Sequence, residues 1–254
     1  MNVRSIIEKI EAFAPVSLSS EWDNPGFLCG NKDKDIKRVL LALDVNLNTI
    51  DEAIENKCDM IVSHHPMFFK GLKRINFSEP EGKAVELLIK NDICVFSAHT
   101  NMDSAENGIN QKLAELFNLS DIKVLEPIGE KTGMGRFGTL PQEMTAEDFS
   151  KLVKEKLDTP FVRVSGGKNI KKLAICSGSG AEYFYLAKEN GCDALLTADV
   201  KYHNAIEAKE NGICLIDAGH FPTEKIVCDI FKEILEDLPI ELVISKDKDI
   251  FKLL

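Results

Sequence analysis

The sequence lacks the features that mark several specialised classes of protein. It has no Cys-x-x-Cys pair among its seven cysteines, and it contains a single tryptophan in 254 residues. An odd number of widely spaced cysteines disfavours a disulfide framework or a thiolate zinc site, and favours reduced residues packed in the core. No stretch of about 18 uncharged residues is present, and charges interrupt the apolar run of residues 1–15, so we expect neither a membrane span nor a signal peptide. The expected location is the cytoplasm.

Clusters of basic residues are also absent. The 31 Lys and Arg are outnumbered by 41 Asp and Glu, the net charge is −10, and no basic run is longer than a pair. Nonspecific nucleic-acid binding depends on clustered cations that neutralise phosphates, so a nucleic-acid partner is disfavoured. A chain of this length with 44% hydrophobic residues can fill one large or two small conventional cores.

Short β-branched runs alternate with amphipathic stretches along most of the chain. We expect strands over 37–44, 59–63 and 93–98, and helices over 47–57, 82–91, 106–117 and 145–157. This alternation is typical of βαβ units, so the predicted fold class is α/β, with mixed, largely parallel sheets flanked by helices.

The pattern restarts in the second half as an internal repeat. Residues 38–59 align without gaps on 172–193, and a Cys-Asp pair ends both segments. The repeat resumes at 91–103 and 211–224, after a connection that is 14 residues longer in the first copy, around MFFKGLKRINFSEP. We therefore predict two similar lobes, 1–126 and 127–254, although βα units also resemble one another generically. Three strand-like segments of the second half (MGRFGTL, FVRVSG and ELVIS) can cross between the lobes.

Four of the five histidines lie just after predicted strands: they are His64, His65, His99 and His220. Ligands bind at this edge of open α/β sheets. Neighbouring residues at a strand end point in different directions, so the tandem His64-His65 before Pro66 can serve two metal ions. The alternative for each histidine is a buried, hydrogen-bonded structural role.

Two carboxylates accompany these histidines. Asp103 in HTNMD is expected in a loop before a helix, whereas GHFPTE places His220 in a turn and Glu224 in a first helical turn. They occupy nearly equivalent places in the repeat and can bridge cations, or can merely favour helix N-termini. If the two copies face each other, their loops converge on one cleft with three imidazoles and two carboxylates.

That donor set suits two divalent transition-metal ions, namely Zn, Fe, Mn, Co or Ni, rather than Ca or Mg. Two ions about 3.5–4 Å apart can activate water, which makes hydrolysis the natural reaction class. His99 has no ligand role in this scheme, and is either the catalytic general acid or base or a structural histidine.

Five motifs together resemble the NIF-three-like family, whose members are often named GTP cyclohydrolase 1 type 2 homologs. They are EWDNPG (21–26), VSHHP (62–66), SAHTNMD (97–103), CSGSGA (176–181) and IDAGHFPTE (216–224). The resemblance implies two metal ions bound by His64, His65, Asp103, His220 and Glu224, with Glu224 bridging. It also implies a toroidal homohexamer whose sites face an inner cavity. Some members carry an inserted middle domain, for which the 126–165 stretch has no room.

The first hypothesis for function is a dinuclear-metal hydrolase of the cyclohydrolase or phosphoester type, acting on a small nucleotide-like or phosphorylated substrate. The alternative is a non-enzymatic protein for metal storage, delivery or regulatory assembly. Two motifs stay open: the loop 177–181 is a phosphate cradle or a tight turn, and Trp22 is a packing anchor or a cleft wall.

Overall fold

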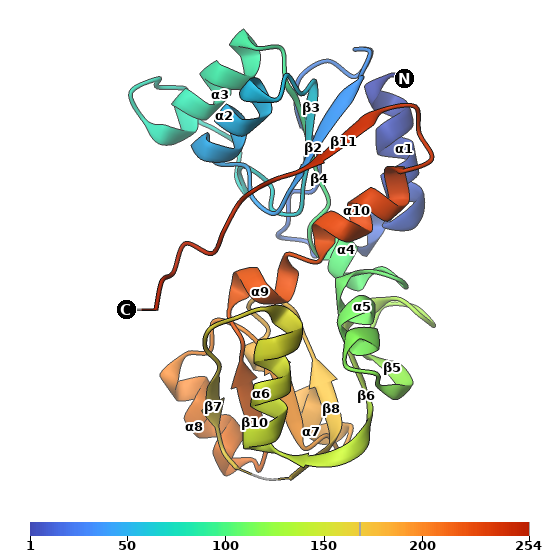
Figure 1. The fold of residues 1–254 in the computed structure, drawn as a ribbon, viewed down its shortest axis with the longest axis vertical. Helices are drawn as coiled ribbons and strands as arrows, with labels where there is room; N and C mark the ends of the chain where they lie inside the picture. Colours follow the sequence, from blue (N-terminus) through green and yellow to red (C-terminus); the bar gives the residue numbers. More distant parts are fainter. Residues whose placement is uncertain (168, 254) are drawn as a thin grey trace. The chain divides into compact units, whose positions relative to one another are not determined.

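The computed structural model describes residues 1–167 and 169–253, which form two compact units (Figure 1). Unit 1 comprises Met1–Met102 and Val227–Asp247, and unit 2 comprises Asp103–Ile226 with the described residues from Lys248 onward. This division differs from two continuous lobes that meet at residue 126, because the chain leaves unit 1 after Met102 and later returns to it.

Unit 1 contains a five-stranded sheet in the order β1-β4-β3-β2-β11, in which only β1 runs antiparallel to its neighbour. Its elements are α1 (Val3–Phe13), η1 (Val16–Leu18), β1 (Gly26–Cys29), β2 (Arg38–Ala42), α2 (Leu47–Glu55), β3 (Met60–Ser63), α3 (Pro80–Lys90), β4 (Cys94–Ser97), α10 (Val227–Leu235) and β11 (Glu241–Ile244). The three central strands are apolar and buried, as expected for parallel strands covered on both faces.

The C-terminal elements belong to unit 1 because of their apolar spacing and strand pairing. Helix α10 buries Val227, Ile230, Phe231 and Ile234, a spacing that forms one helix face, and this helix packs on α1 and β2 (Figure 1). Strand β11 then pairs in parallel with β2. The ELVIS segment therefore completes the first sheet, as the sequence allowed.

Unit 2 contains a six-stranded sheet in the order β5-β6-β8-β9-β10-β7. Its elements are α5 (Ile109–Leu116), β5 (Ser120–Pro127), β6 (Gly133–Thr145), α6 (Ala146–Leu157), β7 (Arg163–Ser165), β8 (Asn169–Ile175), η2 (Ala181–Tyr183), α7 (Phe184–Glu189), β9 (Ala194–Thr197), α8 (Tyr202–Glu210), β10 (Cys214–Asp217) and α9 (His220–Glu224). Strands β8, β9 and β10 are parallel, and β5, β6 and β7 add antiparallel pairs. The mixed α/β architecture is confirmed.

The paired Cys-Asp motifs play the same local role in each unit. The Asp59 carboxylate accepts hydrogen bonds from two backbone amides around the start of β2, at 2.8 and 3.1 Å. The Asp193 carboxylate accepts from two amides of β8, at 2.9 and 2.8 Å. Each aspartate thus ties the start of one parallel strand to the start of the next. The internal repeat itself stays a prediction from the sequence.

Predicted and observed elements differ mainly at their ends. Strands β2, β3 and β4 and helices α2, α3 and α6 lie where the sequence places them. The helix predicted over 106–117 begins only at Ile109, after Gly108 as its N-cap. The HTNMD segment was expected to be a loop, but Thr100–Ser104 is a short helix, α4. His220 was expected in a turn, but it is the first residue of α9, because Gly219 turns the chain at a φ of 87°.

The seven cysteines form no disulfide, and five of them are buried. Burial raises the pKa of every one of these thiols, to about 11 for Cys58, Cys192 and Cys214 and to about 12 for Cys228. The prediction of reduced, packed cysteines is confirmed. Among the described residues, no helix combines the length and apolar character needed to span a membrane.

Candidate metal centre

Three histidines gather at the carboxyl ends of two neighbouring parallel strands of unit 1. His64 and His65 follow β3 and His99 follows β4, and these strands pair in parallel. The ring centroids lie 5.0 Å apart for His64 and His65, 5.0 Å for His64 and His99, and 5.4 Å for His65 and His99. One nitrogen of each ring lies within 4.8 Å of the others, so the group can hold a metal ion.

Each of these rings is oriented by an oxygen at Nδ1. The pairs are His64 with the Ala98 carbonyl at 2.9 Å, His65 with Asp44 Oδ1 at 2.8 Å, and His99 with Asp23 Oδ1 at 2.8 Å. Metal-binding histidines almost always donate their second ring N–H to a carboxylate or carbonyl, which sets the tautomer and directs the other nitrogen to the ion. A metal would therefore be bound through Nε2.

The side chain of Asp23 is buried, and it anchors the loop that precedes β1. Burial by itself would raise the pKa of Asp23, but hydrogen bonds from His99 and Thr100 outweigh it and lower the pKa to about 2. The carboxylate is therefore ionised at neutral pH. The EWDNPG motif thus supplies the residue that orients the His99 ring.

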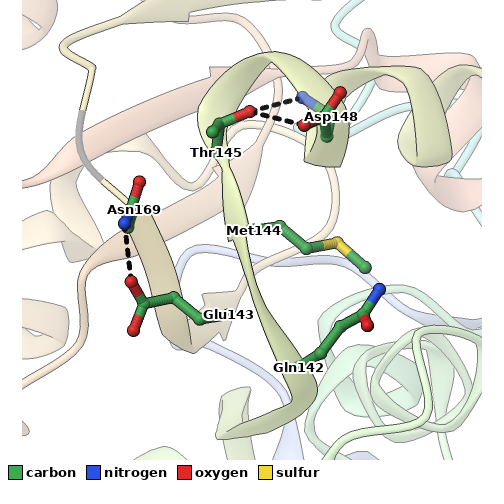
Figure 2. Close-up of a pocket in the computed structure, with 6 residues that line it drawn as sticks. All are labelled: Gln142, Glu143, Met144, Thr145, Asp148 and Asn169. Carbon is green, nitrogen blue, oxygen red and sulfur yellow. Dashed lines mark hydrogen bonds between the residues drawn. The ribbon is translucent and has the colours of Figure 1, made fainter.

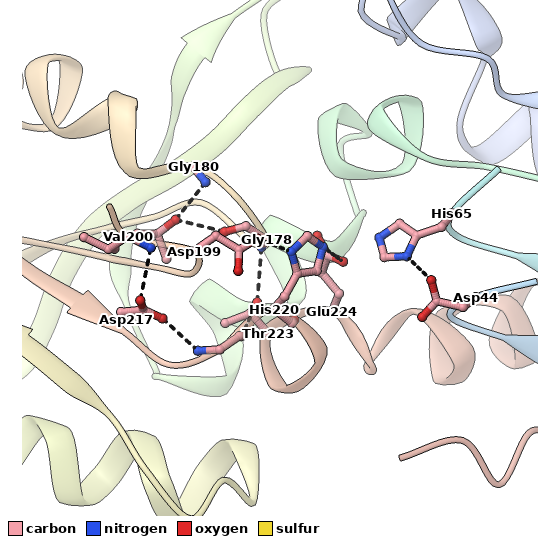
Figure 3. Close-up of polar contacts among 12 residues, drawn as sticks. Asp44, His65, Gly178, Gly180, Asp199, Val200, Asp217, His220, Thr223 and Glu224 are labelled. Carbon is pink, nitrogen blue, oxygen red and sulfur yellow. Dashed lines mark hydrogen bonds and ion pairs between the residues drawn. The ribbon is translucent and has the colours of Figure 1, made fainter. Parts of the chain in front are cut away.

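Unit 2 places a histidine and a glutamate one turn apart on α9. His220 Nε2 lies 2.9 Å from Glu224 Oε2, and its Nδ1 lies 2.7 Å from Asp199 Oδ2 (Figure 3). The Glu224 side chain is only 4% exposed. His220 is therefore paired with a carboxylate in the same way as His65 and His99.

The turn before α9 is held by Asp217, the last residue of β10. Its carboxylate accepts a hydrogen bond from the Val200 amide at 3.1 Å (Figure 3). It also accepts hydrogen bonds from the Gly219 amide, at 3.1 Å, and from Arg163. Gly219 adopts a positive φ that side chains disfavour. This arrangement directs the chain from the end of β10 into α9 and so presents His220.

The SGSGA loop packs tightly against α9. The Gly178 amide donates to Thr223 Oγ1 at 3.1 Å (Figure 3), and the Gly180 amide donates to Thr197 Oγ1 at 3.0 Å. Because both amides bond within the unit and Gly178 has a positive φ, these contacts favour the tight-turn interpretation of the loop. Gly178 has a φ of 58°, and a Cβ there would lie 2.0 Å from Glu224 Oε1. Glycine thus leaves the space that the Glu224 carboxylate occupies.

Asp103 is tied to the same loop. Its Oδ1 accepts a hydrogen bond from Ser177 Oγ at 3.0 Å, while the Ser177 amide donates to Asn110 Oδ1 at 2.9 Å. The side chain of Asn110 in turn donates to the Asp103 carbonyl at 3.2 Å. Asp103 is 6% exposed, and it belongs to unit 2 rather than to a first lobe.

The donor chemistry fits borderline transition metals. Taken by itself, unit 1 holds the imidazoles of His64, His65 and His99, and unit 2 holds the His220 imidazole with the buried carboxylates of Asp103 and Glu224. Three of the four strand-end histidines have a carboxylate at Nδ1, which is the partner typical of metal ligands. Histidine and carboxylate groups of the described residues could therefore hold a metal ion.

A hollow of about 380 Å³ at the junction of β6 and α6 does not compete with this site (Figure 2). Its described lining residues include no histidine or cysteine. Thr145 Oγ1 caps α6 by accepting from the Asp148 amide at 3.1 Å, and the Asn169 amide group donates to Glu143 at 2.6 Å. These polar groups serve the fold.

The sequence prediction missed the residues that orient the ligands. Asp44 and Asp199 each lie two residues after the last residue of a strand, so an acidic residue just beyond a strand's carboxyl end was the available signal. Ser177 carried no signal beyond its place in the SGSGA loop. Asp23 lies within a motif that was singled out, but the partner of its side chain could not be read from the sequence.

The chain is similar to known proteins along almost its whole length. The family model Duf34/NIF3 (NGG1p interacting factor 3) matches residues 1–249. A Clostridium perfringens protein named GTP cyclohydrolase 1 type 2 homolog is 38% identical over 260 aligned residues, which cover 99% of each chain.

Solved structures agree with this similarity. A Bacillus cereus protein related to NIF3 superposes with a TM-score of 0.94 at 26% identity, covering 100% of this chain and 99% of that one. Reduced HcgD from Methanocaldococcus jannaschii superposes with a TM-score of 0.86 at 34% identity, covering 97% of this chain and 98% of that one. With the family model spanning nearly every residue, the chain belongs to the Duf34/NIF3 (NGG1p interacting factor 3) family.

Proposed function

We propose that this protein is a metal-dependent hydrolase that binds two divalent transition-metal ions. The ligands in this proposal are His64, His65, Asp103, His220 and Glu224, with Glu224 shared by both ions. The observation that carries the proposal is the carboxylate at Nδ1 of the strand-end histidines, because this pairing is typical of metal ligands.

Two bound ions would supply Lewis acidity and lower the pKa of a coordinated water. The chain's own residues would prepare the site for that chemistry. Asp44 and Asp199 hold the rings of His65 and His220 in one orientation, and Ser177 holds the Asp103 carboxylate. Preformed ligand orientation reduces the rearrangement needed when the ions bind.

His99 is proposed to transfer a proton through Nε2. Its Nδ1 faces the ionised carboxylate of Asp23, which fixes the tautomer and stabilises the ring when it is protonated. This His-Asp arrangement is suited to a general acid or base next to the ligands. The competing role, in which His99 is itself a ligand, is tested below.

The proposed substrate is a small nucleotide-like or phosphorylated molecule, and a GTP cyclohydrolase-like reaction is one form of it. The name of the Clostridium perfringens relative supports this class, since the identity covers nearly the whole of both chains. Resemblance to the family further supports a homo-oligomer, for which we propose a hexamer.

Elemental analysis of untagged protein, followed by a hydrolysis screen with that metal restored, tests the function. We expect two ions per chain in the wild type and about one or none in Glu224→Gln, because the shared carboxylate is neutralised. His203→Ala is the matched control, since His203 is exposed at the start of α8. The screen contains GTP, with formate release as the readout, and a panel of phosphoesters.

The His99→Asn variant separates the two roles of that residue. A proton-transfer role predicts unchanged metal content with turnover reduced about 10²- to 10⁴-fold. Loss of metal in this variant would instead make His99 a ligand. Unchanged two-ion occupancy in Glu224→Gln would contradict the shared carboxylate, and bound metal without turnover of any substrate would favour the storage or delivery function.

A further inference from the structure

Two exposed aromatic rings stand beside His99 in unit 1. Trp22 is 64% exposed and Phe69 is 48% exposed. Their ring centroids lie 6.1 Å apart, and they lie 5.8 and 5.6 Å from the His99 ring, each in an edge-on arrangement. Trp22 is therefore no packing anchor. We call Trp22 and Phe69 the aromatic pair.

The aromatic pair is held by its neighbours rather than by burial of its own rings. Asp23, next to Trp22, is fixed by His99 and Thr100. The side chain of Asn24 donates to the Phe68 carbonyl at 2.8 Å, which ties the loop of Trp22 to the loop of Phe69. Both rings are thus positioned beside His99 while their faces stay open to water. Covering such rings releases water from a large apolar area, so a flat ligand is favoured there.

The charge of the adjoining segment favours an anionic ligand. Three cations, Lys70, Lys73 and Arg74, follow Phe69 within five residues, and all three are exposed. In a chain with a net charge of −10 this is a local excess of positive charge. It belongs to the longer connection in the first copy of the sequence repeat. A small aromatic ring that carries a phosphate matches the exposed rings and the neighbouring cations better than a second copy of this acidic chain does.

We propose that the aromatic pair stacks the heteroaromatic ring of a nucleotide substrate beside His99. This inference rests on the proposed function, because it identifies which substrates would reach the proton-transfer residue. Stacking of a base on an aromatic side chain contributes enough for about a 5- to 150-fold change in affinity. The cations of residues 70–74 attract its phosphate.

The single tryptophan makes the test direct. Trp22 is the only source of tryptophan emission in the chain, so its fluorescence reports occupancy of the aromatic pair. AMP and GMP are titrated into the full-length protein, both metal-free and zinc-loaded, with ribose 5-phosphate as the ring-free probe. We expect saturable quenching by the nucleotides and none by ribose 5-phosphate.

Matched variants separate stacking from general effects. Phe69→Leu should weaken nucleotide affinity about tenfold. Phe77→Leu should leave the affinity unchanged, since Phe77 is also exposed, at 57% against 48% for Phe69, but lies outside the pair. Trp22→Leu should lose binding measured by equilibrium dialysis, and Trp22→Phe should retain most of it. Circular dichroism checks that each variant is folded.

The inference would be overturned if Trp22 emission did not change at millimolar nucleotide, or if Phe69→Leu and Phe77→Leu had equal effects on affinity. It would also be overturned if, without ligand, self-association of the protein already protected Trp22 from quenching by acrylamide, because the aromatic pair would then be covered by a second copy of the chain. Because the readout is equilibrium binding, it is independent of turnover. Nucleotide binding at the pair without hydrolysis would contradict only the proposed function. Hydrolysis with an unchanged KM in Phe69→Leu would contradict only the stacking.

Discussion

At the scale of single residues, the candidate site depends on partners that orient each ligand. Asp44, Asp23 and Asp199 each accept from the Nδ1 side of one histidine, at 2.7–2.8 Å. Such partners typically change metal affinity by about 10- to 100-fold when they are removed. The cysteines differ from these histidines: burial raises the pKa of their thiols, which favours the protonated form over the nucleophilic thiolate at neutral pH.

The raised pKa of the buried thiols predicts alkaline destabilisation. A folded pKa near 11 against an unfolded value of about 8.5 means that the native state retains protons that the unfolded state releases. Stability is therefore complete below about pH 8.5 and falls as pH rises toward 11, by up to roughly 1 kcal/mol per pH unit for each thiol. Urea unfolding at pH 8, 9 and 10 measures the slope. Cys214→Ala should make it shallower, and an unchanged slope would refute the assignment.

At the scale of elements, a glycine turn sets the position of the α9 carboxylate. The loop between β8 and η2 approaches α9 so closely that a Cβ on Gly178 would overlap Glu224 Oε1. The Thr223 hydroxyl accepts from the Gly178 amide and so keeps the loop and the helix in contact. A backbone contact of this kind is available only to glycine, since its φ is also positive.

Gly178→Ala is therefore expected to displace Glu224 and reduce metal affinity by at least about tenfold, as loss of a positioned ligand does. Gly191→Ala is the matched control, because Gly191 has a similar φ of 69° but more space around it. The atom nearest to a new Cβ there would be the Lys172 amine nitrogen, at 4.0 Å. Both variants carry backbone strain, so both should lower the melting temperature. Isothermal titration with zinc compares them, and equal affinities would show that the contact does not matter.

The sequence predicted most elements but not every boundary. The apolar runs of β2, β3 and β4 and the Thr145 cap of α6 are local signals, and they placed these elements correctly. The short helix α4 was missed, and the start of α9 was placed too late, because five residues hold too little periodicity to distinguish a helical turn from a loop.

At the scale of the whole molecule, the chain crosses between units after Met102 and again after Ile226. Helix α10 completes the core of unit 1 through buried residues that include Phe231. The last strand, β11, then forms the edge of the first sheet. Unit 1 thus depends on residues from both ends of the described chain.

Phe231→Ala is expected to destabilise unit 1 by about 3–5 kcal/mol, the usual cost of removing a buried phenylalanine. Tryptophan emission reports this unit, because Trp22 lies in it, while all three tyrosines lie in unit 2. Phe184→Ala in α7 is the matched variant for unit 2, where Phe184 is fully buried. If the units unfold separately, Phe231→Ala shifts only the tryptophan transition in urea. If the tryptophan and tyrosine transitions shifted together, the two units would unfold as one cooperative unit.

The sequence by itself determined the alternation of strands and helices and the positions of the histidines at strand ends. Those features depend on spacings of a few residues, which the chain records directly. Only the tertiary structure decided that Asp23 holds His99, that Ser177 holds Asp103, and that β11 pairs with β2. These partners are separated by more than 70 residues, and they are selected by packing and backbone hydrogen bonding across the fold, which leave no local pattern.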